Sequence, residues 1–239
     1  DALRQRAIAL GASPDRTTVI PYGVDSNRFA PDPAARLERR RALGVPDEAP
    51  LVVAVGRLAR KKGFEHLIEA AARLRKDYPT LRVAIAGAGD LDAALRAQAS
   101  TAGIADRVHF LGVVSHESIP ALLAAADIAV VPSVHDEAGN VDGLPNTALE
   151  IMASGTPLVA TPVGGIGAVA TDGETARLVP ERDGAALAGV IAELIDHPEQ
   201  RRALGERSRQ VAMTEYSWSR TTERFTRIYE CVLDHPHAS

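Results

Sequence analysis

The sequence contains little cysteine, few aromatic residues and no large excess of charge, and each shortage excludes a class of protein. One cysteine among 239 residues excludes a disulfide framework and a cysteine-rich metal site, and fits a reducing compartment such as the cytoplasm. A formal net charge of -4 offers no general attraction to nucleic acid. No apolar run approaches the ~20 residues that span a bilayer, and from the first residues we expect no signal peptide. We therefore expect a cytoplasmic protein without a transmembrane segment or a nucleic-acid partner.

The composition is otherwise that of an ordinary globular chain. Hydrophobic residues make up 46% and charged residues 24%, while aromatic residues are only 4%, so the core is expected to be aliphatic. The length suits one large domain or two small ones. Because the sequence starts at Asp1 rather than at methionine, we expect a processed chain or a part of a longer one.

Short apolar runs alternate with segments of helical periodicity, and this order predicts an α/β fold. The runs are rich in Val, Ile and Leu, as in parallel strands covered by helices on both faces. The predicted strands are Leu51–Val55, Arg82–Ala86, Val108–Leu111, Ile128–Val131, Pro157–Ala160 and Arg177–Val179. The predicted helices include a segment from Phe64 and the ranges Arg36–Leu43, Pro145–Ser154, Ala185–Asp196, Pro198–Met213 and Ser217–Leu233. Thr18–Pro21 is predicted to be a further short strand.

The loop after the first predicted strand of this sheet is basic. It runs from Gly56 and Arg57 to Lys62 and Gly63, just before a helix. In an open parallel sheet, ligands bind beyond the carboxyl ends of the strands, where Arg and Lys donate to phosphate oxygens. A solvated basic loop without a ligand is the alternative, and the loop alone does not decide between them.

Other loops at the same edge are rich in glycine or acids. Gly87-Ala88-Gly89 is only part of a dinucleotide fingerprint, and the turn at 164–167 contains three glycines. The loop between Pro132 and Asn146 carries three acids and His135, but their spacing matches no pattern of metal ligands, so we predict no metal site. Motifs of α/β hydrolases, zincins and P-loop NTPases are absent from the sequence.

The ordered set of motifs resembles the C-terminal, donor-binding half of a GT-B glycosyltransferase of family 4, the retaining group often called group 1. The resemblance covers nearly the whole chain and depends on the order and spacing of the pieces rather than on any one of them. The pieces are Val19-Ile20-Pro21-Tyr22-Gly23-Val24-Asp25, Gly56-Arg57 with Lys62-Gly63, Gly87-x-Gly89, Phe110-Leu111-Gly112, Ala126-Asp127 before Val130-Val131-Pro132-Ser133, Glu150-x-Met152-Ala153-x-Gly155 continuing to Thr161, and Tyr216-Ser217-Trp218.

The resemblance implies a Rossmann-like sheet and roles for particular residues. Arg57 and Lys62 would hold the pyrophosphate of a nucleotide sugar and stabilise the leaving group. Glu150 would bind the ribose hydroxyls, and Asp142 would contact the transferred sugar. The full predicted site, with backbone N–H groups and the turn near the base included, is Gly56, Arg57, Lys62, Val113, Asp142, Gly143, Leu144, Asn146, Thr147 and Glu150. No tightly bound cofactor and no metal are implied.

The same resemblance predicts the domain organisation and the partners. Residues 1–33 would be the remnant of a preceding domain and a linker, 34–215 the nucleotide-sugar-binding domain, and 216–239 a helix that returns to an absent N-terminal domain. Without that domain we expect no transfer to the glycan or lipid-linked acceptor. The helix would leave an apolar side partly uncovered at Phe225, Ile228 and Val232, which invites self-association or a partner chain. A polysaccharide-building enzyme of this kind would be cytoplasmic, or peripheral at the inner membrane face in a full-length form.

The sequence departs from the family pattern at two positions, and two other functions remain open. Asp142 is one methylene shorter than the family's glutamate, and Ala168 stands where the family's Gly-Gly-x-Pro-Glu motif has its acid. These departures favour a non-catalytic nucleotide-sugar binding module as the alternative. An NAD-binding Rossmann domain is a further alternative, although the first turn is basic and lacks the G-x-G-x-x-G fingerprint.

Overall fold

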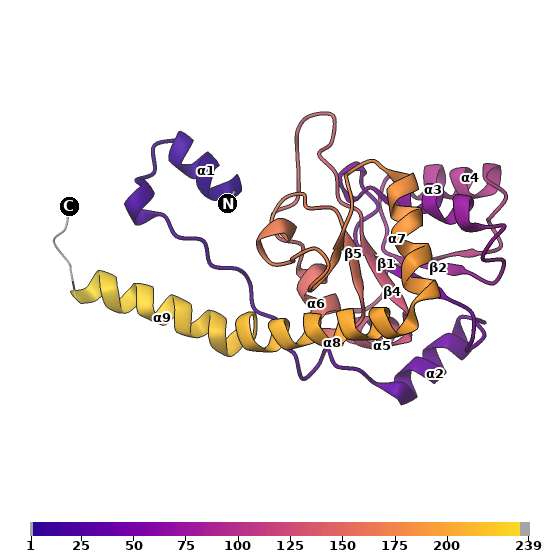
Figure 1. Ribbon diagram of the computed structural model, residues 1–239. Helices are drawn as coiled ribbons and strands as arrows, with labels where there is room; N and C mark the ends of the chain where they lie inside the picture. The colour runs from indigo at the N-terminus through magenta and orange to yellow at the C-terminus, as the bar shows by residue number, and fades with distance from the viewer. Residues whose placement is uncertain (1, 235–239) are drawn as a thin grey trace.

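The computed structural model describes residues 2–234, so the ends of the first and last predicted segments, residue 1 and residues 235–239, lie outside the description. The described chain forms a parallel sheet in the order β3-β2-β1-β4-β5-β6 (Figure 1). Its strands are β1 (Leu51–Val55), β2 (Arg82–Ala86), β3 (Val108–Gly112), β4 (Ile128–Val131), β5 (Leu158–Ala160) and β6 (Arg177–Leu178). The prediction of a parallel α/β sheet is confirmed, and for the six strands that form it each predicted end differs from the observed one by no more than one residue.

Helices connect the strands and extend beyond them at both ends. They are α1 (Ala2–Ala9), α2 (Pro33–Ala42), α3 (Phe64–Leu74), α4 (Asp92–Thr101), α5 (Ile119–Ala125), α6 (Asn146–Ser154), α7 (Gly184–Asp196), α8 (Pro198–Glu215) and α9 (Trp218–Asp234). Short 3-10 turns are η1 (Pro14–Arg16), η2 (Arg60–Lys62), η3 (His116–Ser118) and η4 (Ile166–Ala168). Helix α6 ends as predicted, because Gly155 adopts the left-handed conformation that glycine accepts without strain.

The sheet is buried on both faces. Helices α3, α4 and α7 cover one face, while α5, α6 and α8 cover the other and α2 packs against α5 (Figure 1). Successive strand residues point to opposite faces, so Val52 and Ala54 contact the first helix layer while Leu51 and Val53 contact the second. Two-sided burial explains why the strands are continuously apolar rather than alternating.

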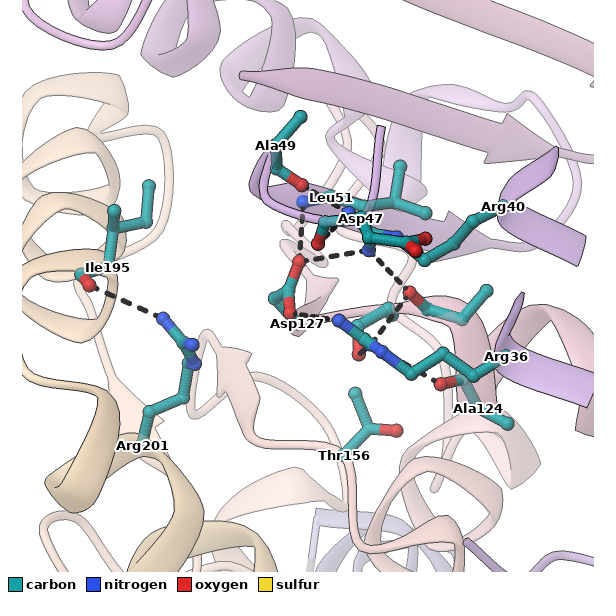
Figure 2. A network of polar contacts seen from close by, with 12 residues as sticks. Arg36, Arg40, Asp47, Ala49, Leu51, Ala124, Asp127, Thr156, Ile195 and Arg201 are labelled. Carbon is teal, nitrogen blue, oxygen red and sulfur yellow. Dashed lines mark hydrogen bonds and ion pairs between the residues drawn. The ribbon is translucent and has the colours of Figure 1, made fainter. Parts of the chain in front are cut away.

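A buried arginine joins α2 to the amino ends of β1 and β4 (Figure 2). Arg40 is fully buried and Asp127 accepts from it at 3.1 Å, while Arg36 donates to the other carboxylate oxygen at 2.7 Å. Asp127 also accepts from the N–H of Leu51 at 2.8 Å. The guanidinium of Arg40 further donates to the carbonyl oxygens of Pro46, Asp47, Ala49 and Ala125. This arginine–aspartate network lies at the end of the sheet opposite to the carboxyl-end loops.

The predicted strand at Thr18–Pro21 is wrong. This segment is irregular and forms no ladder with another strand, because it runs outside the sheet toward α1 (Figure 1). Helix α9 extends away from the sheet, and an isolated bridge between Val24 and Ser217 ties its start to the linker. Phe225 is 45% and Val232 is 62% exposed, whereas Ile228 is half-buried, so the predicted apolar side is partly uncovered within residues 2–234.

Candidate functional site

Glycines allow the loops at the carboxyl edge of the sheet to pack directly on one another. A side chain at Gly63 would place its first carbon 2.0 Å from the carbonyl oxygen of Pro132, at the exit of β4. At Gly164, the corresponding distance to the carbonyl oxygen of Asp142 would be 2.1 Å. Both glycines also have positive φ angles, 64° and 65°. These contacts bring the segments that follow β1, β4 and β5 together at one place.

Two lysines and one aspartate meet where these loops pack. Lys61 Nζ lies 2.8 Å from Asp142 Oδ1, and Lys62 Nζ lies 2.5 Å from Asp142 Oδ2. The Asp142 side chain is 14% exposed, and burial by itself would raise its pKa; the two ammonium groups outweigh that effect and hold the pKa below its usual value. Asp142 is therefore ionised at neutral pH. The Val134 N–H donates to the carbonyl of Lys61 at 3.0 Å, which fixes the lysine segment to the exit of β4.

Two other parts of the sequence-predicted site, Arg57 and the start of α6, lack a polar partner among the described residues. The Arg57 side chain is exposed, and none of the described residues forms a hydrogen bond or an ion pair with it. The start of α6 has no side-chain cap. Within residues 2–234, nothing accepts a hydrogen bond from the N–H groups of Gly143, Leu144, Asn146 and Thr147. Free N–H groups at a helix start favour an anion.

Glu150 lies farther along α6 and has a partner that the sequence did not indicate. Its side chain is 15% exposed, and His116 Nε2 lies 3.2 Å from its Oε1. His116 belongs to η3 after β3, and its ring packs edge-on against Phe29 with centroids 5.8 Å apart. Val113, which was predicted to lie near a nucleotide base, is 82% exposed in the same connection. The Glu150 carboxylate is thus held by a histidine from the neighbouring strand's loop.

The structure therefore brings some of the predicted residues into contact and leaves others separate. Lys62 contacts Asp142, and its aliphatic stem passes over Gly56, where an added side-chain carbon would lie 3.6 Å away. Lys61 was missed, since a run of two lysines in a loop gives no indication of which one points inward. The described part of the chain contains no group of three or more His, Cys, Asp or Glu side chains that could hold a metal ion.

The loop that carries Asp142 is anchored at its other end. The N–H of His135 donates to Glu181 Oε2 at 2.8 Å, and the His135 ring lies 3.1 Å from Oε1. Arg182 also donates to the carbonyl of His135. The hydrogen bond from the backbone N–H of His135 lowers the pKa of Glu181 most, and the His135 ring lowers it further. Burial raises this pKa but is outweighed, so Glu181 is ionised at neutral pH.

Comparison with known proteins assigns this chain to one family. A family model described as "Glycosyl transferases group 1" matches residues 35–211. The chain belongs to this family of glycosyltransferases, which decides against the NAD-binding alternative. Among solved structures, Anabaena HepE in complex with UDP-glucose superposes with a TM-score of 0.86 at 25% identity, over 96% of this chain and 62% of that chain. The predicted GT-B architecture of the donor-side domain is confirmed at the level of the fold.

Two curated relatives are similar over most of this sequence. The "GDP-mannose-dependent alpha-(1-6)-phosphatidylinositol monomannoside mannosyltransferase" of Mycolicibacterium smegmatis is 36% identical over 83% of this chain and 52% of its own length. The "D-inositol 3-phosphate glycosyltransferase" of Geodermatophilus obscurus is 38% identical over 98% of this chain and 51% of its own length. The chain thus spans about half the length of the curated relatives it matches. Within residues 2–234, none of the helices combines the length and the apolar character that crossing a membrane requires.

Proposed function

We propose that this chain binds the donor of a retaining glycosyltransferase, a UDP- or GDP-hexose, and presents it for transfer to a glycan or lipid-linked acceptor. The observation that carries the proposal is the group of cations at the carboxyl edge, Lys61, Lys62 and Arg57, beside the uncapped start of α6. This arrangement suits a diphosphate, which needs several charge-assisted donors. The similarity to a GDP-mannose-dependent enzyme and to a structure holding UDP-glucose supports a sugar nucleotide as the ligand.

Each of the site residues has a role in the proposed reaction. The bond between the anomeric carbon and the diphosphate oxygen breaks, and its electron pair stays on the diphosphate. The acceptor hydroxyl oxygen bonds to the anomeric carbon and gives its proton to the departing diphosphate. Arg57 and Lys62 stabilise that developing charge more strongly than the charge of the intact donor, which lowers the barrier. Glu150 accepts hydrogen bonds from the ribose hydroxyls, and Asp142 accepts from a hydroxyl of the hexose. Val113 lies against the nucleotide base.

A non-catalytic sugar-nucleotide module is the second candidate function. It is favoured by Ala168, which is exposed on η4 and offers no carboxylate at the position where the family pattern has an acid. Both candidates bind the same ligand, so transfer of a hexose to an acceptor by a full-length form separates them.

The proposed diphosphate contacts predict a selective loss of affinity. Lys62→Ala and Arg57→Ala should each weaken binding of UDP or GDP by about 1.5–3 kcal/mol and leave uridine or guanosine binding nearly unchanged, because a charge-assisted phosphate contact is lost. Thermal shifts with a panel of UDP, GDP, their sugars and the nucleosides measure this, since a ligand of the folded state raises its stability. Lys76→Ala is the matched control, because it removes an exposed lysine that lies after α3 in the same connection between β1 and β2. Equal losses for nucleoside and diphosphate, or no binding by any nucleotide, count against the proposed function.

The proposed ribose contact predicts a loss that depends on the sugar hydroxyls. Glu150→Gln should weaken UDP or GDP binding by about 1.5–3 kcal/mol, because a charged acceptor of hydrogen bonds is replaced by a neutral one. The 2′-deoxynucleotide should already bind weakly to the unchanged protein, and its affinity should fall little further in the variant. Calorimetry measures the affinity of each protein for the ribose and the deoxyribose nucleotide. Glu117→Gln, an exposed neighbour of His116, is the control. The same loss for the ribose and deoxyribose forms would show that Glu150 acts elsewhere.

A further inference from the structure

We propose that Asp142 is a built-in competitor of the donor's diphosphate: its carboxylate holds Lys61 and Lys62 in the free protein, and a bound diphosphate takes both lysines from it. The inference rests on the proposed function, because it concerns how the same site accepts its ligand. It also assigns Lys61 as a phosphate-binding residue beside Lys62.

The Asp142 carboxylate contacts the two lysines in the way that we expect of a phosphate group. Each of its oxygens faces a different ammonium group, at 2.8 Å and 2.5 Å. Lys61 and Lys62 are 27% and 18% exposed, so both side chains are largely held in the cluster rather than extended into solvent. A carboxylate and a phosphate present lysine with the same kind of charged acceptor oxygen. The same two lysines therefore suit either anion.

The balance of charge favours the exchange. Two lysines face one carboxylate, which leaves one positive charge uncompensated, and the neighbouring Arg57 has no described partner. A diphosphate carries more negative charge and more acceptor oxygens than a carboxylate, so it satisfies these three cations more completely. A nucleoside without phosphate has no group that replaces Asp142.

The backbone allows the carboxylate to leave while the lysines stay. The lysine segment is fixed because the Val134 N–H donates to the Lys61 carbonyl and because Gly63 packs on Pro132. The backbone of the Asp142 loop is held at both ends without the carboxylate: the Asp142 carbonyl packs on Gly164, and His135 bonds to Glu181 at the far end. The carboxylate can therefore leave the lysines by rotation of its own side chain. Once released, the Asp142 carboxylate is available to a hydroxyl of the hexose. Recognition of the sugar is thereby coupled to the presence of the diphosphate.

The test compares two charge removals on one loop. Asp142→Asn frees both lysines. Glu137→Gln removes an equal charge from an exposed side chain, whose ion-pair partner is Arg60 at 3.9 Å and not Lys61 or Lys62. In calorimetric titrations, we expect Asp142→Asn to bind UDP or GDP about tenfold more tightly than the unchanged chain, with nucleoside binding unaltered. Glu137→Gln should stay within about twofold, since exposed charges contribute little. Asp142→Ala should match Asp142→Asn, and melting temperatures verify that both are folded.

A second pair of variants tests the role of Lys61. Lys61→Gln should bind the diphosphate about tenfold more weakly, because one of its two lysines is gone, while Arg60→Gln next to it should change little. Equal or weaker diphosphate binding by both Asp142 variants would overturn the inference, and so would unchanged binding by Lys61→Gln. Inorganic pyrophosphate separates this result from failure of the proposed function. If no nucleotide binds, tighter pyrophosphate binding by Asp142→Asn still supports the exchange, and unchanged pyrophosphate binding overturns it.

Discussion

Replacing Arg40 with alanine is expected to lower the free energy of unfolding by about 3–5 kcal/mol, because removing one partner of a buried ion pair leaves the others uncompensated. Arg40 is fully buried and donates to Asp127 and to carbonyl oxygens that lie on both sides of it (Figure 2). The substitution deletes all of these donors at once and leaves a cavity where the guanidinium was. Urea denaturation followed by circular dichroism measures the loss.

Arg41→Ala is the matched control for this change. Arg41 lies on the same helix and is exposed, and none of residues 2–234 forms a hydrogen bond or an ion pair with its side chain. Its replacement should change the free energy of unfolding by less than about 0.5 kcal/mol. Because the arginine–aspartate network lies at the opposite end of the sheet from Lys62, the folded fraction of Arg40→Ala should keep its affinity for nucleotide diphosphates. A loss for Arg40→Ala as small as that of the control would show that Asp127 and Arg36 suffice to hold α2.

The sheet could be predicted because its strands are buried on both faces and therefore consist of unbroken aliphatic runs. Val52 and Val53 are both buried and point to opposite helix layers. The same reasoning failed at Thr18–Pro21, where an apolar tetrapeptide has no neighbouring strand with which to pair. Local composition indicates the tendency to be extended, whereas strand formation also requires a partner.

The candidate site could be predicted only in part, since several of its contacts join distant segments. The resemblance indicated Lys62, Asp142 and Glu150 one at a time, each on its own loop or helix. It could not indicate that Asp142 pairs with Lys61 or that Glu150 pairs with His116, because those pairings follow from how the loops pack. The role of Asp127 was likewise hidden: the residue was recognised as part of a motif, and only the buried arginine explains why an acid stands there.

These 239 residues alone are expected to bind a sugar nucleotide but to transfer its hexose to an acceptor at no useful rate. The matched curated relatives are about twice as long as the part that this chain covers. A transfer reaction needs the acceptor hydroxyl held close to the anomeric carbon, and such positioning supplies about 7–11 kcal/mol of the barrier reduction. Arg57 and Val113 are exposed at the edge that we propose binds the donor, and closing that edge would also exclude water.

The assay gives this chain a UDP- or GDP-hexose together with glycan and lipid-linked acceptors, with the full-length Mycolicibacterium smegmatis relative as the reference for a longer protein. Donor binding is measured on the same sample by thermal shift, so that absence of product is not caused by unfolding. We expect a clear shift with the donor and product formation slower by several orders of magnitude than in the reference, as an unpositioned acceptor implies. Transfer at a comparable rate would show that the donor-binding edge positions the acceptor itself, and the apolar residues of α9, Phe225 among them, would then need another explanation for their exposure.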